Sequence, residues 1–197
     1  MNLPELLQLS GYYWRTCTLH AGVKMDLFSP LGRKPMTAAE LARTVHADRR
    51  GLEMLLNALT ALDLLNKEGD LFRATDFSAT YLAKDSPDYM GHIIMHHHFL
   101  VEGWSKLDEA VRNGTPVRKR SSHDTDDRER ESFLMGMYNL ATQLAPRLAE
   151  ELDLSGCRRL LDLAGGPGTY AIHFCRRHPE LRAVVFDLPT TRPFAEQ

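Results

Sequence analysis

Apolar residues in the N-terminal part of the chain recur at steps of three and four, the spacing at which side chains share one face of a helix. The first stripe of this kind consists of Trp14, Cys17, Ala21, Met25 and Phe28. The segment at 29–35, which contains Pro and Gly, is expected to break this helix. Because so apolar a stripe in a small domain needs a partner to cover it, the pattern predicts a homodimer formed through the N-terminal helices.

Capping residues mark where the next two helices start. Thr37 and Glu40 form the T-x-x-E pattern of a capping box ahead of an apolar run, and Asp48 is suited to cap the helix that follows. The apolar face of this second helix consists of Leu52, Leu55, Leu56, Leu59 and Leu62. Two short apolar pieces around the turn at 68–70 predict a β-hairpin. Helix, turn, helix and hairpin together indicate a winged-helix arrangement.

A polar stretch follows this helical region. Further helices are expected over residues 78–83 and 89–111. Residues 113–131 then combine Gly, Pro and Ser with a basic and an acidic cluster and have almost no apolar residue to bury, which predicts a solvated linker. A helix is predicted over 132–152. Its apolar face consists of Phe133, Met137, Leu140, Leu144 and Leu148.

The last part of the chain has the pattern of a β-α-β unit. A strand at 159–163 leads into a glycine-rich turn, a helix and a second strand within 182–189. We therefore expect a mainly α, winged-helix domain at 1–112, a linker, and the first part of an α/β Rossmann-like domain at 132–197. A doubly wound sheet needs further β-α units to bury both faces of its strands, so the 197 residues are expected to be a fragment of a longer protein.

Composition and charge narrow the classes of partner. The net charge of −2 and the pI near 6.5 provide no positive field that would attract nucleic acid or an anionic membrane. Three widely separated cysteines without a C-x-x-C pair indicate free thiols in a reducing compartment. Neither a signal-peptide pattern nor an apolar run of about 18 residues is visible. The expectation is a cytoplasmic protein that binds neither nucleic acid nor a membrane.

The glycine-rich turn fits two ligand-binding patterns. Gly166, Gly168 and Ala171 satisfy the dinucleotide pattern G-x-G-x-x-A, and Asp187 follows at about the distance expected of a ribose-binding acid. However, Asp162 ends the first strand just before the turn, where it would place a negative charge beside a pyrophosphate. A ligand with a cationic amino group and no phosphate suits this carboxylate better, and S-adenosylmethionine is such a ligand.

Five segments carry a resemblance to one family. D-L-A-G-G-P-G at 162–168 resembles the first motif of class I S-adenosylmethionine-dependent methyltransferases. V-V-F-D-L-P at 184–189 resembles the second-strand motif of the O-methyltransferases related to the caffeate and hydroxyindole enzymes. Residues 37–65 are similar to the winged-helix dimerisation domain of that family. The Trp-containing segment at 100–116 and F-L-M-G-M at 133–137 are similar to its later helices.

The resemblance implies S-adenosyl-L-methionine as cofactor and assigns residues to it. The turn beneath the cofactor would consist of Gly165, Gly166 and Gly168, together with Ala164, which stands where the pattern usually has glycine. Asp187 would accept the ribose hydroxyls and Leu188 would pack on the adenine. Asp162 would reach the amino-acid end of the cofactor through water, and Met137 would touch the cofactor or the substrate.

The resemblance also implies the reaction, which is in-line transfer of the sulfonium methyl group to a hydroxyl oxygen of a small, aromatic acceptor. Phe133, Val101 and Trp104 are the candidates for the acceptor pocket; Val101 stands where plant members often have a substrate-contacting methionine. The catalytic histidine of the family is expected beyond Gln197, so no catalytic residue is assigned in this chain. Transfer to carbon or nitrogen stays open.

Two histidines have the spacing of metal ligands. His92 and His96 lie four residues apart on a predicted helix. The motif H-E-x-x-H is absent, and no carboxylate or cysteine is placed to complete a site. We therefore expect no metal.

Two functions of other classes stay open as alternatives, a winged-helix DNA-binding regulator and an NAD-dependent oxidoreductase. A regulator would place basic side chains along its second helix to meet phosphates. Here Arg49 and Arg50 stand at the helix start, and the only later charges are Glu53 and Asp63. The rest of this helix is dominated by Leu and Ala, which favours burial over contact with a DNA groove.

Overall fold

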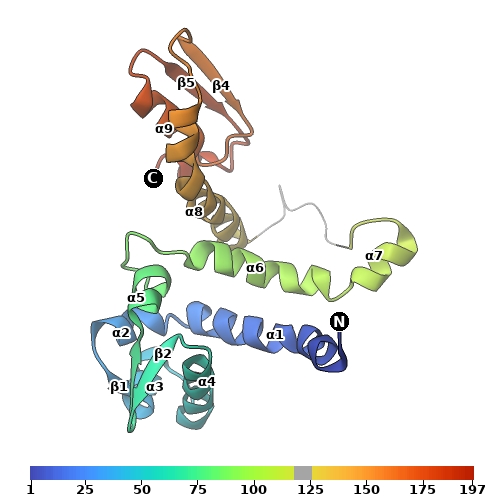
Figure 1. Cartoon of the computed structure of the whole chain (residues 1–197), viewed down its shortest axis with the longest axis vertical. Helices are drawn as coiled ribbons and strands as arrows, with labels where there is room; N and C mark the ends of the chain where they lie inside the picture. The colour runs from blue at the N-terminus through green and yellow to red at the C-terminus, as the bar shows by residue number, and fades with distance from the viewer. Residues whose placement is uncertain (118–125) are drawn as a thin grey trace. The chain divides into compact units, whose positions relative to one another are not determined.

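The computed structural model describes residues 1–117 and 126–197, so part of the predicted linker lies outside the described residues. The chain divides into two compact units, residues 1–98 and 99–197, and the boundary falls within one helix (Figure 1). In the described part of the chain, no helix has both the length and the apolar character that crossing a membrane requires.

The first unit begins with a long helix, α1 (Leu3–Lys24), and a short one, α2 (Phe28–Arg33). The predicted stripe does not form one exposed face. Trp14 is exposed on α1, whereas Phe28 starts α2 and is completely buried. The helix break lies at Asp26, which adopts a left-handed conformation with φ of 52°. The prediction of a break at 29–35 was therefore wrong, because Pro30 lies in the first turn of α2, where no backbone N–H is needed.

A winged-helix arrangement follows, as predicted (Figure 1). Its elements are β1 (Met36–Thr37), α3 (Ala38–Val45), α4 (Arg49–Ala61), β2 (Leu65–Glu68) and β3 (Leu71–Ala74). Thr37 and Glu40 form the capping box, and the Gly51 amide donates to Asp48 Oδ1 at 2.7 Å. The hairpin turns at Gly69, whose φ is 58°. The sheet is antiparallel in the order β1-β3-β2, and β1 is too short to have been recognised from the sequence.

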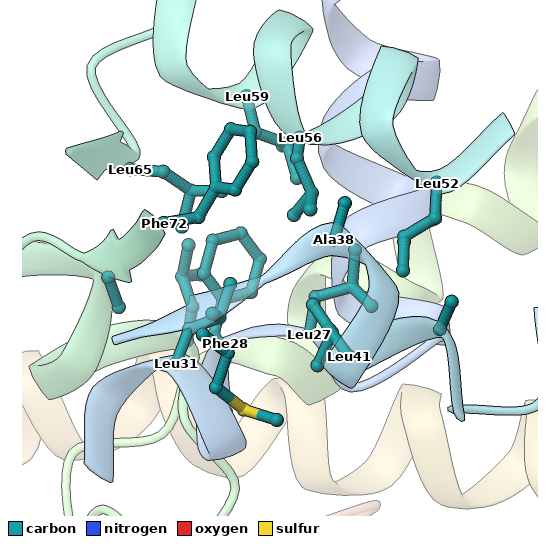
Figure 2. Packing of buried hydrophobic residues seen from close by; sticks show 14 of the residues in the cluster. Leu27, Phe28, Leu31, Ala38, Leu41, Leu52, Leu56, Leu59, Leu65 and Phe72 are labelled. Carbon is teal, nitrogen blue, oxygen red and sulfur yellow. The ribbon is translucent and has the colours of Figure 1, made fainter. Parts of the chain in front are cut away.

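One core of leucine and phenylalanine side chains holds this unit together (Figure 2). Its completely or almost completely buried members come from α2 and the residue before it, and from α3, α4, β2 and β3; they are Leu27, Phe28, Leu31, Leu41, Leu56, Leu59, Leu65 and Phe72. Each such side chain contributes roughly 1.5–3 kcal/mol by leaving water. Of the leucine face predicted for α4, Leu52, Leu56 and Leu59 are buried in the core of their own unit, and Leu55 packs against it.

The helical region at 76–113 consists of three helices, α5 (Asp76–Leu82), α6 (Gly91–Trp104) and α7 (Leu107–Asn113). The single helix predicted over 89–111 is interrupted at Ser105. The Ser105 hydroxyl donates to the carbonyl of Glu102 at 2.8 Å, and the Lys106 amide donates to Gly103 in a tighter turn. Serine side chains that bond to a backbone carbonyl in this way compete with the regular helix.

The second unit contains the predicted β-α-β unit. Its elements after α6 and α7 are α8 (Asp127–Glu151), β4 (Arg159–Leu163), α9 (Thr169–Arg177), β5 (Arg182–Phe186) and α10 (Arg192–Ala195). The two strands are parallel and pair Asp162 with Val185 and Leu163 with Phe186. α8 begins before the predicted position, so residues 127–131, assigned to the linker from the sequence, are helical.

The buried face of α8 differs from the predicted one. Phe133, Leu140, Leu144 and Leu148 are exposed, while the buried apolar positions are Leu134, Ala141, Ala145 and Ala149. α8 packs against α9, and Ala149 joins Phe174 and Leu181 in the small core of this unit. Small side chains on the contact face allow two helices to approach closely, which explains why the alanines rather than the leucines are inside.

An apolar face of the two-stranded sheet is exposed in the described residues. Leu161, Leu163, Val184 and Phe186 point to the same side, because parallel partners in register share a face, and each is more than 60% exposed. On the other side, Leu160 packs on the core with α9. Parallel sheets normally have both faces covered.

A buried histidine predicts that the first unit loses stability in acid. His20 on α1 is 4% exposed, and its ring lies 5.4 Å from that of His98 on α6. Burial, and then the neighbouring His98 and His97, lower the pKa of His20. Burial and then Lys24 likewise lower the pKa of His98. Because the pKa is lower in the folded chain, the unfolded chain binds more protons, and the free energy of unfolding rises with pH. The folded chain therefore has its full stability above the ordinary histidine pKa of about 6.5 and loses stability as the pH falls below it.

We therefore expect the unfolding temperature of the chain to fall between pH 7 and pH 5. In His20→Gln this fall should be smaller, because one buried titrating group is gone. Calorimetric or circular-dichroism melts at the two pH values check the prediction. His46→Asn is the matched control, since His46 is exposed in a left-handed conformation that asparagine tolerates. An equal loss of unfolding temperature in the His20 variant and the wild type would contradict the assignment.

Candidate functional site

The loop that joins β4 to α9 adopts an unusual backbone conformation. Ala164, Gly166 and Gly168 have φ values of 57°, 56° and 73°. For Ala164 this left-handed conformation costs roughly 1–2 kcal/mol, which glycine would avoid. The Ala164 amide compensates in part by donating to the Phe186 carbonyl at 2.7 Å, so the loop continues the pairing of the two strands. Ala164, which stands where the pattern usually has glycine, therefore fits the loop at an energetic cost.

Gly165 brings its backbone against the carboxylate of Asp162. A Cβ atom on Gly165 would lie 2.5 Å from Asp162 Cγ, a distance that no side chain could accept. Asp162 Oδ2 is buried and has no hydrogen-bond partner among the described residues. Buried carboxylate oxygens are normally hydrogen-bonded. The site therefore presents an acceptor that a donor or a cation could satisfy.

Asp187, which follows β5, fastens the loop to the second strand. Its Oδ2 accepts from the Gly166 amide at 2.8 Å, and its Oδ1 accepts from the Leu188 amide at 2.7 Å and the Thr191 hydroxyl at 2.9 Å. Burial would raise the pKa of Asp187, but these three hydrogen bonds outweigh it and hold the pKa below its ordinary value. Asp187 is therefore an ionised acceptor at neutral pH.

α9 starts directly from the loop. Gly168 occupies its N-cap position, and a Cβ atom there would lie 3.0 Å from Val185 Cγ2. Thr169, the first helical residue, is 3% exposed, and its Oγ1 has no hydrogen-bond partner in the described part of the chain. The sequence reasoning did not select Thr169. The sequence feature that could have indicated Thr169 is its position directly after the last glycine of the loop, at the N-terminus of a helix.

The predicted site residues fall into two groups. Asp162, the loop at 164–168, Asp187 and Leu188 lie together at the carboxyl ends of β4 and β5; hydrogen bonds join the loop and Leu188 to Asp187, and Asp162 lies against Gly165. Leu188 is 43% exposed. The remaining predicted residues belong to helices outside this cluster; Met137 and Phe133 lie on α8, and Val101 and Trp104 on α6.

A metal centre finds no support in the same region. Among the described residues, no three or more His, Cys, Asp and Glu side chains are grouped so that they could hold a metal ion. What the cluster provides is two carboxylates beside a glycine-rich loop. Such an arrangement can bind a ligand that carries hydroxyl donors at one end and a cation at the other.

The close approach of Gly165 and Asp162 can be tested by substitution. Gly165→Ala should lower the unfolding temperature of the second unit, because the new methyl group would have to displace a buried carboxylate. Gly156→Ala is the matched control, since its Cβ atom would meet nothing within 4 Å. Hydrogen exchange of the β4 and α9 amides is the local measurement. Equal protection in the two variants would show that the loop yields without cost.

Comparison with known proteins agrees with this geometry. The family profile described as the O-methyltransferase dimerisation domain matches residues 7–84, and the profile of the O-methyltransferase domain matches residues 104–197. The chain is 38% identical over 192 residues to 3-hydroxy-5-methyl-1-naphthoate 3-O-methyltransferase of Streptomyces sahachiroi. That alignment covers 94% of this chain and 56% of the relative.

Two further proteins are similar over nearly the whole chain. The N,N-dimethyltransferase OxyT of Streptomyces rimosus is 30% identical over 202 residues, which cover 97% of this chain and 58% of that protein. The solved structure of an O-methyltransferase family protein from Burkholderia thailandensis has a TM-score of 0.86 and 36% identity, covering 100% of this chain and 59% of its own. The chain thus spans little more than half the length of these relatives.

The profile of the dimerisation domain matches the first part of the chain and the profile of the O-methyltransferase domain matches the last part. Together the two matches include most of the described residues. The glycine loop and Asp187 lie inside the second match. Solved structures of the same fold have been determined with S-adenosylmethionine or S-adenosylhomocysteine. The chain belongs to the O-methyltransferase family in which a dimerisation domain precedes the S-adenosylmethionine-dependent methyltransferase domain.

Proposed function

We propose that this chain is part of an enzyme that transfers a methyl group from S-adenosylmethionine to a hydroxyl oxygen of a small aromatic molecule. The observation that carries the cofactor assignment is the buried Oδ2 of Asp162 beside Gly165, which has no hydrogen-bond partner in the described part of the chain. An ammonium group would satisfy this oxygen, whereas a pyrophosphate would be repelled by it. S-adenosylmethionine carries such an ammonium group and no phosphate, so it fits the site better than NAD does.

The other residues of the site fit the remaining parts of the cofactor. Asp187 is ionised and offers an acceptor to a ribose hydroxyl beside the loop. Leu188 is exposed next to it and offers an apolar surface to the adenine. Gly166 and Gly168 keep the loop free of side chains that would block the approach. When bound, S-adenosylmethionine supplies an electrophilic methyl group on its sulfonium; the residues of this chain hold and orient it.

The acceptor is proposed from the relatives. The naphthoate enzyme is named for transfer to a 3-hydroxyl group of an aromatic acid, and the family profile carries the name O-methyltransferase. OxyT is named for transfer to nitrogen, so an amine is the second candidate acceptor. Val101, Trp104 and Phe133 stay the proposed pocket residues, with Met137 near the cofactor, and the catalytic base is proposed to lie outside these 197 residues.

The two alternative functions have less support. A helix that reads DNA needs basic side chains along its exposed face to meet phosphates. α4 buries Leu52, Leu56 and Leu59 in its own unit, and its only cations are Arg49 and Arg50 at its start. The NAD hypothesis conflicts with Asp162, as argued above.

The proposed partner in solution is a second copy of the chain. The first half of α1 exposes a concentration of large apolar side chains; these are Leu3, Leu6, Leu7, Leu9, Tyr12, Tyr13 and Trp14. This segment overlaps the match to the dimerisation domain, which begins at residue 7. Apolar surface of this extent is typical of protein–protein interfaces.

Calorimetric titration with S-adenosylhomocysteine tests the cofactor proposal. We expect binding to the wild-type chain and at least about tenfold weaker binding to Asp187→Ala, because a charged acceptor is removed. Asp108→Asn, an exposed acid on α7, is the control and should bind like the wild type. Binding of NAD in place of S-adenosylhomocysteine, or of neither ligand to the folded chain, would overturn the proposal.

Multi-angle light scattering tests the dimer. The wild-type chain should have twice the monomer mass, and the double variant Leu7→Glu with Trp14→Glu should be monomeric, since two charges would be buried at the interface. Met54→Glu introduces a charge at an equally exposed apolar position on α4 and should stay dimeric. A monomeric wild-type chain would refute the homodimer.

A further inference from the structure

Thr191 holds the carboxylate of Asp187 from the side opposite the glycine loop. Its side chain is 5% exposed, and its hydroxyl donates to Asp187 Oδ1 at 2.9 Å. The Thr191 amide donates to the Leu188 carbonyl at 2.9 Å, which closes a turn over residues 188–191. Thr191 is also the N-cap residue of α10, and its carbonyl accepts from the amides of Phe194 and Ala195 in that helix. The position of this hydroxyl is therefore determined by backbone contacts on both sides.

We infer that Thr191 is a positioning residue that orients Asp187 so that Oδ2 receives a hydroxyl of the cofactor. This inference rests on the proposed function. A carboxylate has about four acceptor positions, two on each oxygen. Oδ1 accepts from the Leu188 amide and the Thr191 hydroxyl, which fill it, whereas among the described residues Oδ2 accepts only from the Gly166 amide. The open acceptor position therefore belongs to Oδ2, the oxygen on the side of the loop.

Without the Thr191 hydroxyl this distinction between the two oxygens would be lost. Oδ1 would keep only the Leu188 amide as donor and gain an open acceptor position of its own, so the open positions would no longer be confined to the oxygen on the side of the loop. The charged form would also lose one of the hydrogen bonds that favour it, and the pKa of Asp187 would rise. Both effects reach the ligand through Asp187, although Thr191 itself need not touch the ligand.

The neighbouring threonine provides a matched comparison. Thr190 precedes Thr191 in the same turn and is only partly buried. Valine has the shape of threonine but no hydroxyl, so Thr191→Val removes the donor and keeps the volume. Thr191→Ser keeps the donor and removes a methyl group. Thr190→Val makes the same chemical change at a position that gives Asp187 no hydrogen bond in the described structure.

Two measurements on the 197-residue chain test the inference. The first is the pKa of Asp187, followed by carboxyl NMR without ligand; Thr191→Val should raise it, and Thr191→Ser and Thr190→Val should leave it near the wild-type value. The second is the affinity for S-adenosylhomocysteine as a function of pH. Thr191→Val should bind about tenfold or more weakly, as expected for a lost bond to a charged group, and its acid limit of binding should move to higher pH.

The outcomes separate this inference from the proposed function. A folded Thr191→Val chain with the wild-type pKa and affinity would overturn the inference while the cofactor assignment stands. If Thr191→Val raises the pKa of Asp187 but the wild-type chain binds no S-adenosylhomocysteine, the cofactor assignment is overturned, and with it the role given to Oδ2. Should Thr191→Val not fold, Thr191→Ala in the same two measurements decides, with Thr191→Ser as its hydroxyl-retaining control.

Discussion

The site depends on one hydrogen-bonded carboxylate, that of Asp187. It joins the Gly166 amide of the loop after β4 to the turn after β5. The loop itself is strained, with Ala164 in a left-handed conformation. Such a backbone persists only where its surroundings hold it, and here the Phe186 carbonyl and the Asp187 carboxylate do so from the neighbouring strand. Strand pairing, loop conformation and an ionised acceptor are therefore parts of one arrangement.

The two units are stabilised by different kinds of packing. The first contains a continuous core of Leu and Phe side chains around a short antiparallel sheet, and its helices α1, α3 and α4 begin at side-chain caps. The second has a small core in which Ala149 of α8 faces Phe174 of α9. Its larger apolar residues, such as Leu144 on α8 and Leu163 on β4, remain exposed.

Electrostatics at the site favour one class of ligand over another. Asp162 and Asp187 both lie at the carboxyl ends of the strands. Each oxygen of Asp187 accepts a hydrogen bond from the chain, whereas Oδ2 of Asp162 has no partner among the described residues. Two carboxylates so placed disfavour a phosphate and favour a ligand with hydroxyl and ammonium donors. The same loop geometry with a neutral residue at position 162 would not make this distinction.

The sequence alone determined the local features, because they depend on residues near one another in the chain. The cap at Asp48, the turn at Gly69, the strand at 159–163 and the glycine loop all follow from local steric and hydrogen-bonding preferences. Only the tertiary structure decided which apolar face is buried. Phe28 enters the core instead of an external stripe, and α8 turns its alanines rather than its leucines inward, because both depend on what packs against them. The role inferred for Thr191 could not be predicted from the sequence for the same reason, because its hydroxyl reaches Asp187 only when the turn after β5 folds back onto that residue.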